Sequence, residues 1–300
     1  MAPVVHVGLV QLATSEDPDE NRRRTVQHVH QAARRGAQLV CLQELFASRY
    51  FCQVEDPTWF DLAESVPGPS THALSEAARQ LGIAIVVPVF ERRAVGLYHN
   101  SCVVLGPDGA QLTLYRKMHV PDDPQYQEKF YFTPGDLGFR VCPTPFGRVG
   151  PLICWDQWYP EAARLVALRG AQILTYPTAI GWLPEEKASD GATQLRAWRT
   201  MHRSHAIANG VFVVAVNRVG FEPKPGGAFG EGIEFWGHSF VCDPQGVVLA
   251  EAGEGEEVLV VACDLGRSEA VRRWWPFFRD RRIDHYGGLM ERWVGDEEVS

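Results

Sequence analysis

The segment Val149–Glu161 reads VGPLICWDQWYPE, and this stretch decides the predicted fold. An apolar run leads to Cys154, and we expect a helix to begin at residue 160 or 161, because proline fits the first helical position. Apolar residues follow at helical spacing, and Gly170 is suited to a left-handed C-cap. The next apolar run, residues 172–176, reads as another strand. Strand, helix and strand at this spacing predict a βαβ unit with parallel strands.

This βαβ unit places Cys154 at the carboxyl end of a parallel strand, where open α/β sheets bind ligands. A thiol at a sharp turn, close to backbone N–H groups, is well placed to act as a nucleophile. The alternative is an inert core residue, because cysteine is among the most buried residue types. The side chains at the ends of the other predicted strands decide between the two interpretations.

Composition favours a globular protein that is not built for nucleic acid. The chain has 300 residues, of which 45% are hydrophobic and 22% charged, and its formal net charge is −8. That charge argues against a polyanionic partner. We expect no membrane segment, since no apolar run is long enough, and no targeting signal, since the first ten residues lack a basic start.

The seven cysteines are odd in number and lack paired spacing. This pattern predicts reduced thiols in a cytoplasmic protein rather than a disulfide framework. The pairs His28/His30 and His202/His205 lie on helical stretches without an obvious third ligand, so we expect no metal site.

The remaining elements repeat one pattern twice, as β-α-β-α-β-hairpin, and no linker separates the halves. We expect strands over 4–12, 38–42, 83–90, 100–105, 110–115, 211–216, 236–242, 246–250 and 258–263, and helices over 21–34, 70–81 and 192–209. Gly-Pro-Asp-Gly at 106–109 and Asp-Pro-Gln-Gly at 243–246 predict hairpin turns. Two similar sheets, each covered by helices on one face, would pack as a four-layer α-β-β-α sandwich. We therefore predict one α/β domain spanning residues 1–300.

Two charged residues, Glu44 and Lys117, follow predicted strands, as Cys154 does. Attack on an amide-like carbon needs this set: a thiol to form the bond, a carboxylate to move the proton, and a cation for the oxyanion. A backbone N–H such as that of Trp155 would help to hold the oxyanion. The simpler interpretation is that Glu44 and Lys117 are solvated charges, because periodicity cannot show that the three residues meet.

Three longer stretches around these residues carry a family resemblance: QELF at 43–46, YRKMHVPD at 115–122, and ICWDQWYPE at 153–161. This combination resembles the nitrilase superfamily of carbon–nitrogen hydrolases. Within it, YQEKFYF at 126–132, YPTAIG at 176–181 and FRDRR at 278–282 are similar to the N-carbamoylputrescine amidase branch. The likeness spans roughly residues 4–290.

The resemblance implies a Glu–Lys–Cys triad formed by Glu44, Lys117 and Cys154, with Glu128 beside it to position the lysine and the substrate. It also implies the four-layer fold, no cofactor, and homodimers that assemble further. The expected activity is hydrolysis of N-carbamoylputrescine to putrescine, ammonia and CO2 through a cysteine thioester, a step of polyamine biosynthesis. Alternatives within the superfamily are β-ureidopropionase and N-carbamoyl-amino-acid or ω-amide hydrolases.

The far end of the substrate separates these alternatives, since an anionic tail would call for arginines. The residues just after Cys154 include no basic side chain. The acidic and aromatic residues that could surround an ammonium group are Tyr50, Asp122, Asp123, Trp155, Trp182 and Glu185. The pair Asp122-Asp123 could equally shape the turn before Pro124. Residues 182–186, WLPEE, depart from the Ser-Glu-Pro that is usual in this branch, which leaves fine specificity open.

The C-terminal segment, about 267–300, mixes basic and aromatic residues, notably over 272–282. Stacking on nucleic acid is one interpretation, but the acidic chain and the resemblance favour a subunit interface. Two other classes of protein stay open. A papain-like hydrolase would need a histidine base, for which His119 and His238 are candidates, and a non-catalytic scaffold would need no triad.

Overall fold

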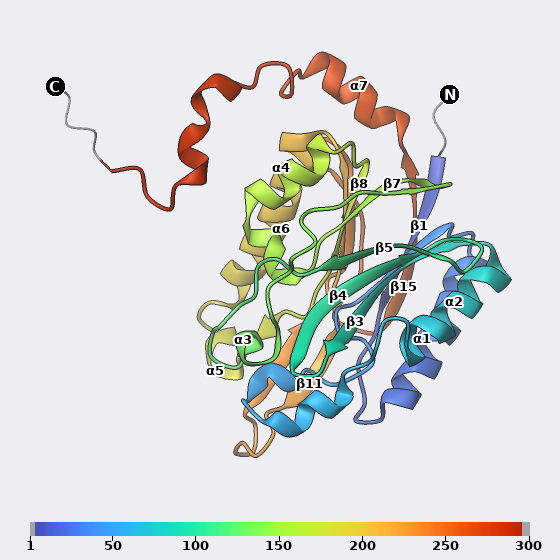
Figure 1. The fold of residues 1–300 in the computed structure, drawn as a ribbon, viewed down its shortest axis with the longest axis vertical. Coiled ribbons are helices and arrows are strands. Elements are labelled where there is room, and N and C mark those ends of the chain that lie inside the picture. Colours follow the sequence, from blue (N-terminus) through green and yellow to red (C-terminus); the bar gives the residue numbers. More distant parts are fainter. Residues whose placement is uncertain (1–3, 296–300) are drawn as a thin grey trace.

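The computed structural model describes residues 4–295, and these form two six-stranded sheets and one small sheet (Figure 1). The first sheet has the order β15 (Glu257–Asp264), β1 (Val4–Gln11), β2 (Leu39–Leu42), β3 (Ala84–Ala94), β4 (Leu97–Leu105) and β5 (Gln111–Arg116). The second has the order β14 (Val248–Glu251), β13 (Phe240–Cys242), β10 (Phe212–Val216), β8 (Ile173–Pro177), β7 (Gly147–Pro151) and β6 (Cys142–Thr144). The small sheet has the order β11 (Val219–Pro223), β12 (Gly232–Trp236) and β9 (Gly181–Trp182).

Four longer helices cover the outer faces of the two large sheets. Helices α1 (Pro18–Arg34) and α2 (Pro69–Leu81) pack on the first sheet, and α4 (Pro160–Leu168) and α6 (Gly191–Asn209) on the second. The short helices are α3 (Glu128–Tyr131), α5 (Pro184–Lys187), η1 (Phe51–Gln53), η2 (Pro57–Leu62) and η3 (Cys154–Trp158). Near the C-terminus lie α7 (Gly266–Trp274), η4 (Ile283–His285) and η5 (Gly287–Met290).

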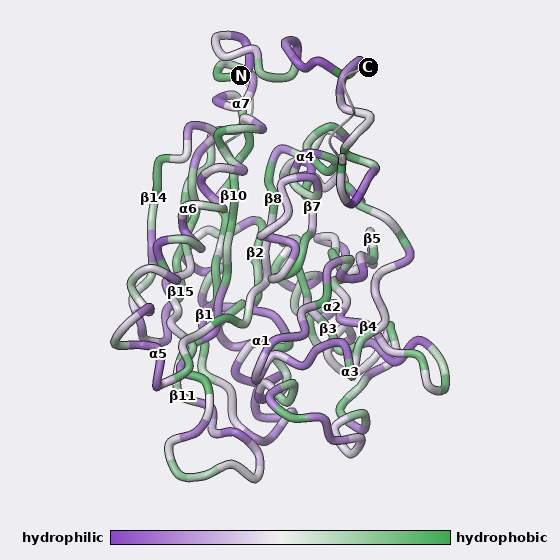
Figure 2. Tube along the Cα trace, turned by 90° about the vertical axis from the view of Figure 1, so that its left-hand side faces the viewer, coloured by the Kyte–Doolittle hydropathy of each residue, from purple (hydrophilic) through white to green (hydrophobic). Residues whose placement is uncertain are grey.

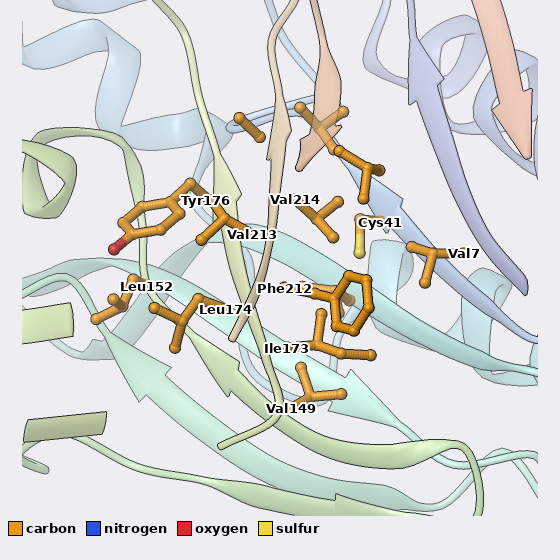
Figure 3. Packing of buried hydrophobic residues seen from close by; sticks show 14 of the residues in the cluster. Val7, Cys41, Val149, Leu152, Ile173, Leu174, Tyr176, Phe212, Val213 and Val214 are labelled. Atoms are coloured by element: carbon orange, nitrogen blue, oxygen red, sulfur yellow. The ribbon is translucent and has the colours of Figure 1, made fainter. Parts of the chain in front are cut away.

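The two sheets face each other through a shared hydrophobic core. Val7 and Cys41 of the first sheet belong to the same buried cluster as Val149, Ile173 and Phe212 of the second (Figure 3). A separate cluster fills the space between the first sheet and helices α1 and α2. Strands buried on both faces are apolar throughout, as the colouring of β2 and β10 shows (Figure 2). The four-layer α-β-β-α sandwich predicted from the sequence is confirmed.

The βαβ unit around Cys154 forms as predicted. Strands β7 and β8 pair in parallel, and α4 connects them, with Pro160 at its first position. Gly150 lets the helix lie close to the strand, because a Cβ there would come within 2.2 Å of Val166. Gly170 follows the helix with a φ of +91°, the left-handed conformation expected of a residue that ends a helix. Both predicted hairpins also form, as β4–β5 and β13–β14.

The strand predicted over residues 236–242 is wrong in one respect. The chain leaves β12 at Trp236 and enters β13 at Phe240, which belongs to a different sheet. The break falls at Gly237 and His238, which have φ values of +66° and +55°. The break coincides with the small and polar residues Gly237, His238 and Ser239, but a residue pattern does not show to which sheet each half of the run belongs.

The C-terminal segment beyond β15 runs past the body of the sandwich, as α7 and the orange-to-red trace of Figure 1 show. Residues 1–3 and 296–300, which the predicted domain and C-terminal segment include, lie outside the described residues. Within residues 4–295, no helix has the length and apolar character that crossing a membrane requires.

Candidate active site

Glu44 and Lys117 stand at one edge of the first sheet. Glu44 comes two residues after β2, and Lys117 directly follows β5. Strands β3 and β4 separate β2 from β5, and because β4 is antiparallel to both its neighbours, β2 and β5 end at the same edge. The side chains of Glu44 and Lys117 therefore approach each other across the ends of β3 and β4. Asn100 of β4 fills the gap and donates a hydrogen bond from Nδ2 to Glu44 Oε1 at 2.7 Å.

The Lys117 ammonium lies between two carboxylates. Its Nζ is 2.8 Å from Glu44 Oε1 and 2.6 Å from Glu128 Oε2. All three side chains are buried, with at most 1% of their surface exposed. Tyr50 donates a hydrogen bond from its hydroxyl to the other oxygen of Glu128, at 2.8 Å. The second oxygen of Glu44 is buried and has no hydrogen-bond partner within residues 4–295, so it is available to accept a proton.

Cys154 comes from the second sheet and occupies a strained turn. It is the first residue of η3 and has a φ of +39°, which is unusual for a residue other than glycine. The N–H groups in the first turn of a helix have no partner within it. Trp155 is the second residue of η3, so its N–H is one of these groups and directly follows the residue that carries the sulfur.

Asp156 ties this turn to the segment that carries Lys117. Its carboxylate accepts hydrogen bonds from Ile153 N–H at 2.9 Å and from the Tyr115 hydroxyl at 2.7 Å. It also accepts one from the backbone N–H of His119 and lies 2.7 Å from the Nδ1 of that ring. The turn around Cys154 is therefore bound to both sides of Lys117, which fixes the sulfur relative to the ammonium.

The charges of the cluster act on the Cys154 thiol in opposite directions. Burial raises the pKa of the Cys154 thiol well above its usual value; Glu44 and Glu128 raise it further, while Lys117 lowers it. Burial lowers the pKa of the Lys117 ammonium, but the carboxylates of Glu128 and Glu44 outweigh burial and leave that pKa well above its ordinary value. Burial also raises the pKa of Glu128. The thiol is thus protonated at neutral pH, and its proton must leave as the sulfur attacks.

A cleft of about 420 Å³ opens onto this cluster. Cys154 and Glu128 line it, together with the aromatic residues Trp155, Trp158, Tyr126 and Trp236. The other lining residues are Pro121, Asp123, Pro124, Ala179, Ile180, Gly181, Leu183, Glu186, Gln194 and Ala197. The lining thus includes three carboxylates and, among the described residues, no lysine, arginine or histidine.

Comparison with known proteins agrees with this geometry. The family model described as carbon-nitrogen hydrolase matches residues 6–273. The chain belongs to the carbon-nitrogen hydrolase family. It is thus a hydrolase of carbon–nitrogen bonds in linear amides, and the resemblance read from its sequence is confirmed.

Individual relatives of this carbon-nitrogen hydrolase match over nearly its full length. The N-carbamoylputrescine amidase of Solanum lycopersicum is 42% identical, covering 96% of this chain and 95% of that protein. A citrullinase of Francisella tularensis is 36% identical, covering 96% and 99%. The crystal structure of a carbon-nitrogen hydrolase from Helicobacter pylori G27 superposes with a TM-score of 0.95 at 47% identity, covering 97% of this chain and 100% of that chain.

The residues predicted to bind substrate lie in different places. Trp155 lines the cleft. Tyr50 is buried behind the cluster and bonds to Glu128, whereas the Trp182 indole N–H donates to Gly191 O at 3.0 Å. Asp122 and Glu185 are exposed and do not line the cleft. Their sequence neighbours Asp123 and Glu186 line it instead, so the structure places Tyr50, Asp122, Trp182 and Glu185 outside the cleft lining.

Sequence reasoning missed several residues that the site uses. Asn100 lies in the polar first half of β4, between His99 and Ser101, and Asp156 lies in a stretch quoted only for its likeness to a family. Gln194 of α6 donates a 3.1 Å hydrogen bond to the Glu186 carboxylate of α5. The polar stretch His99-Asn100-Ser101 next to the apolar residues 102–105 is the one signal that could have indicated a buried polar role.

The histidines that the sequence raised as alternatives do not reach the sulfur. Neither His119 nor His238 lines the cleft, and they bond to Asp156 and Glu251. A papain-like arrangement is therefore not formed. Residues 4–295 contain no group of three or more His, Cys, Asp or Glu side chains that could hold a metal ion.

The raised pKa predicts how Cys154 reacts with iodoacetamide. In the wild type, the alkylation rate should rise steadily from pH 7 to pH 9.5 without a plateau near neutrality, because only the thiolate reacts. Glu44→Gln removes a charge that raises the thiol pKa, so alkylation at pH 8 should become faster. Peptide mass mapping identifies the labelled cysteine. The label should fall on Cys154, because the other six cysteines are at most 1% exposed. Slower alkylation in Glu44→Gln would contradict this account.

Proposed function

We propose that the protein hydrolyses the carbamoyl C–N bonds of N-carbamoylputrescine, releasing putrescine, ammonia and CO2. The observation that carries the proposal is the lining of the cleft. It includes the Cys154 thiol and Glu128, whose carboxylate shares the Lys117 ammonium with Glu44. The rest of the lining is aromatic, acidic and apolar, without a basic side chain among the described residues. Relatives whose name states this activity, at 42% identity over nearly the whole chain, support it.

In the proposed reaction, the Cys154 sulfur attacks the carbamoyl carbon while Glu44 takes the thiol proton. The Lys117 ammonium and the Trp155 N–H stabilise the oxygen that becomes negative. Glu44 then returns the proton to the nitrogen that leaves, which forms a thioester on Cys154. Water, activated by the same carboxylate, cleaves the thioester, and the resulting carbamic acid loses CO2. Glu128 keeps Lys117 in place throughout.

The far end of the substrate is a protonated amine, and two carboxylates of the cleft suit it. Asp123 and Glu186 both line the cleft, and the Gln194 amide orients Glu186. Tryptophan and tyrosine faces attract a cation, and an anionic tail would meet three carboxylates without a matching cation. Glu186 is thus proposed to bind the substrate ammonium, the role that the sequence analysis predicted for Glu185.

A substrate panel tests this assignment through ammonia release, with Cys154→Ala as the blank. The panel contains N-carbamoylputrescine, N-carbamoyl-β-alanine, citrulline, an ω-amide and a nitrile. The wild type should prefer N-carbamoylputrescine in kcat/KM. Glu186→Gln should raise KM for this substrate about 10- to 100-fold, the range expected for one lost charge-assisted hydrogen bond, with little change in kcat.

Glu185→Gln is the matched control, because this glutamate neighbours Glu186 but is exposed outside the cleft. Its KM should equal that of the wild type. Preference for N-carbamoyl-β-alanine or citrulline would overturn the substrate assignment, and an effect of Glu185→Gln equal to that of Glu186→Gln would overturn the role of Glu186.

We also propose how the protein assembles. The chain forms one catalytic domain, and its C-terminal segment packs against a second copy of the chain. Large apolar side chains of this segment are exposed, among them Trp274, Ile283, Leu289, Met290 and Trp293 at 86%, 73%, 64%, 88% and 84%. Phe278 is held between Arg164 of α4 and Arg272, so the segment leaves the body over α4, where Leu165 and Leu168 are exposed. Trp, Phe and Arg side chains are typical of interfaces. The seven free thiols support action in the reducing cytoplasm.

Truncation after Gly266 tests the proposed interface. Light scattering coupled to size exclusion should find dimers or larger assemblies for the full chain and monomers for the truncated chain. Circular dichroism checks that the truncated chain is folded. A truncated chain that stays dimeric would exclude this segment as the interface.

A further inference from the structure

Arg218 is a fully buried guanidinium that does not line the cleft. It lies between β10 and β11, in the second half of the chain, yet all its hydrogen bonds except the one to Glu222 go to the first half. Its Nη2 donates to Glu44 O at 2.7 Å and to Leu45 O at 3.0 Å. Its Nη1 donates to Ser48 O at 3.2 Å. One side chain thus fixes three backbone carbonyls of the segment that carries Glu44.

The backbone at this point needs support. Leu45 has a φ of +49°, a conformation that non-glycine residues rarely adopt and that persists only where surrounding contacts hold it. Two of the three carbonyls that Arg218 binds, those of Glu44 and Leu45, flank the Leu45 Cα. The guanidinium therefore stabilises the turn that directs the Glu44 side chain toward Lys117.

Glu222 of β11 completes the arrangement. Its Oε1 is 2.8 Å from Arg218 Nη1, and its Oε2 accepts the backbone N–H of Tyr50 at 2.5 Å. The Tyr50 hydroxyl in turn donates to Glu128. The buried pair Arg218–Glu222 therefore holds both ends of residues 44–50, and through them it reaches both carboxylates that bind Lys117.

The neighbouring residue Asn217 holds the opposite side of the site. Its Nδ2 donates to Ile180 O at 2.9 Å, and its Oδ1 accepts Ile180 N–H at 3.0 Å. The adjacent Ala179 lines the cleft, and its carbonyl lies 4.0 Å from Cys154 Sγ. Residues 217 and 218 thus join the wall beside the sulfur to the segment that carries Glu44.

We propose that Arg218 and Glu222 are positioning residues, which align Glu44 and Glu128 on Lys117 for the reaction without touching the substrate. A role in stability alone does not require this pair, because replacing a buried ion pair with apolar side chains is often neutral or stabilising. The inference rests on the proposed roles of Glu44 and Lys117, and not on the identity of the substrate.

Arg218→Lys is the first test, since lysine keeps a charge near Glu222 but lacks the planar fork that reaches two carbonyls. The double change Arg218→Met/Glu222→Met removes both charges together, so no unpaired buried charge remains. The double variant should lose about 100-fold in kcat, the effect expected of a misplacement near 1 Å, with KM within about twofold. Arg218→Lys should fall between it and the wild type.

The second readout is the pH profile of Cys154 alkylation by iodoacetamide, which needs no substrate. When Glu44 and Glu128 are displaced from the thiol, they raise its pKa less, so both variants should react at lower pH than the wild type, as is expected of Glu44→Gln. This alkylation profile does not depend on the substrate. A wrong substrate assignment can therefore be distinguished from a wrong role for Arg218 and Glu222.

Arg148→Lys is the matched control. Arg148 also donates to two successive carbonyls, those of Arg169 and Gly170, but it is exposed and does not line the cleft. Its kcat and alkylation profile should match the wild type. A folded double variant with wild-type kcat and alkylation profile would overturn the proposal. Should the double variant not fold, a folded Arg218→Lys with both wild-type values would overturn it equally.

Discussion

A single buried ammonium is the feature on which the rest of the site depends. Lys117 lies within 2.8 Å of two carboxylates, in a place that water does not reach. Burying one cation and two anions is costly unless their mutual contacts and further hydrogen bonds compensate. The chain supplies these bonds from Asn100 to Glu44 and from Tyr50 to Glu128. Burial raises the pKa of the nearby Cys154 thiol, and the two carboxylates raise it further against the opposing effect of Lys117.

The four-layer sandwich lets distant segments supply the members of this group. The first sheet carries Glu44 and Lys117 at one edge, while the second contributes Cys154 at the end of β7. Because the sheets share one core, the sulfur and the ammonium keep a fixed relation. Asp156 then bonds to residues on both sides of Lys117, so the turn that carries Cys154 is not free to relax. The strain at Cys154 is held by these contacts.

Sequence reasoning predicted the elements that have a strong local signal and missed those that depend on side-chain direction. The βαβ unit, both hairpins and the layered fold follow from periodicity, proline and glycine. The residues that line the cleft do not: Glu186 and Asp123 face it, whereas their neighbours Glu185 and Asp122 do not. A shift of one residue in a loop or a single helical turn reverses which side chain points inward. Likewise, nothing local shows that Arg218 contacts a carbonyl 174 residues away.

The most direct test of this account is the protonation state of the cluster, read from a neutron crystal structure of the ligand-free enzyme near neutral pD. The account predicts three deuterium atoms on Lys117 Nζ, with one directed at Glu44 and one at Glu128, no deuterium on Glu44, and a deuterated Cys154 thiol. A neutral Lys117 amine beside a protonated Glu44 would contradict it, because the site would then lack both its cation and its proton acceptor.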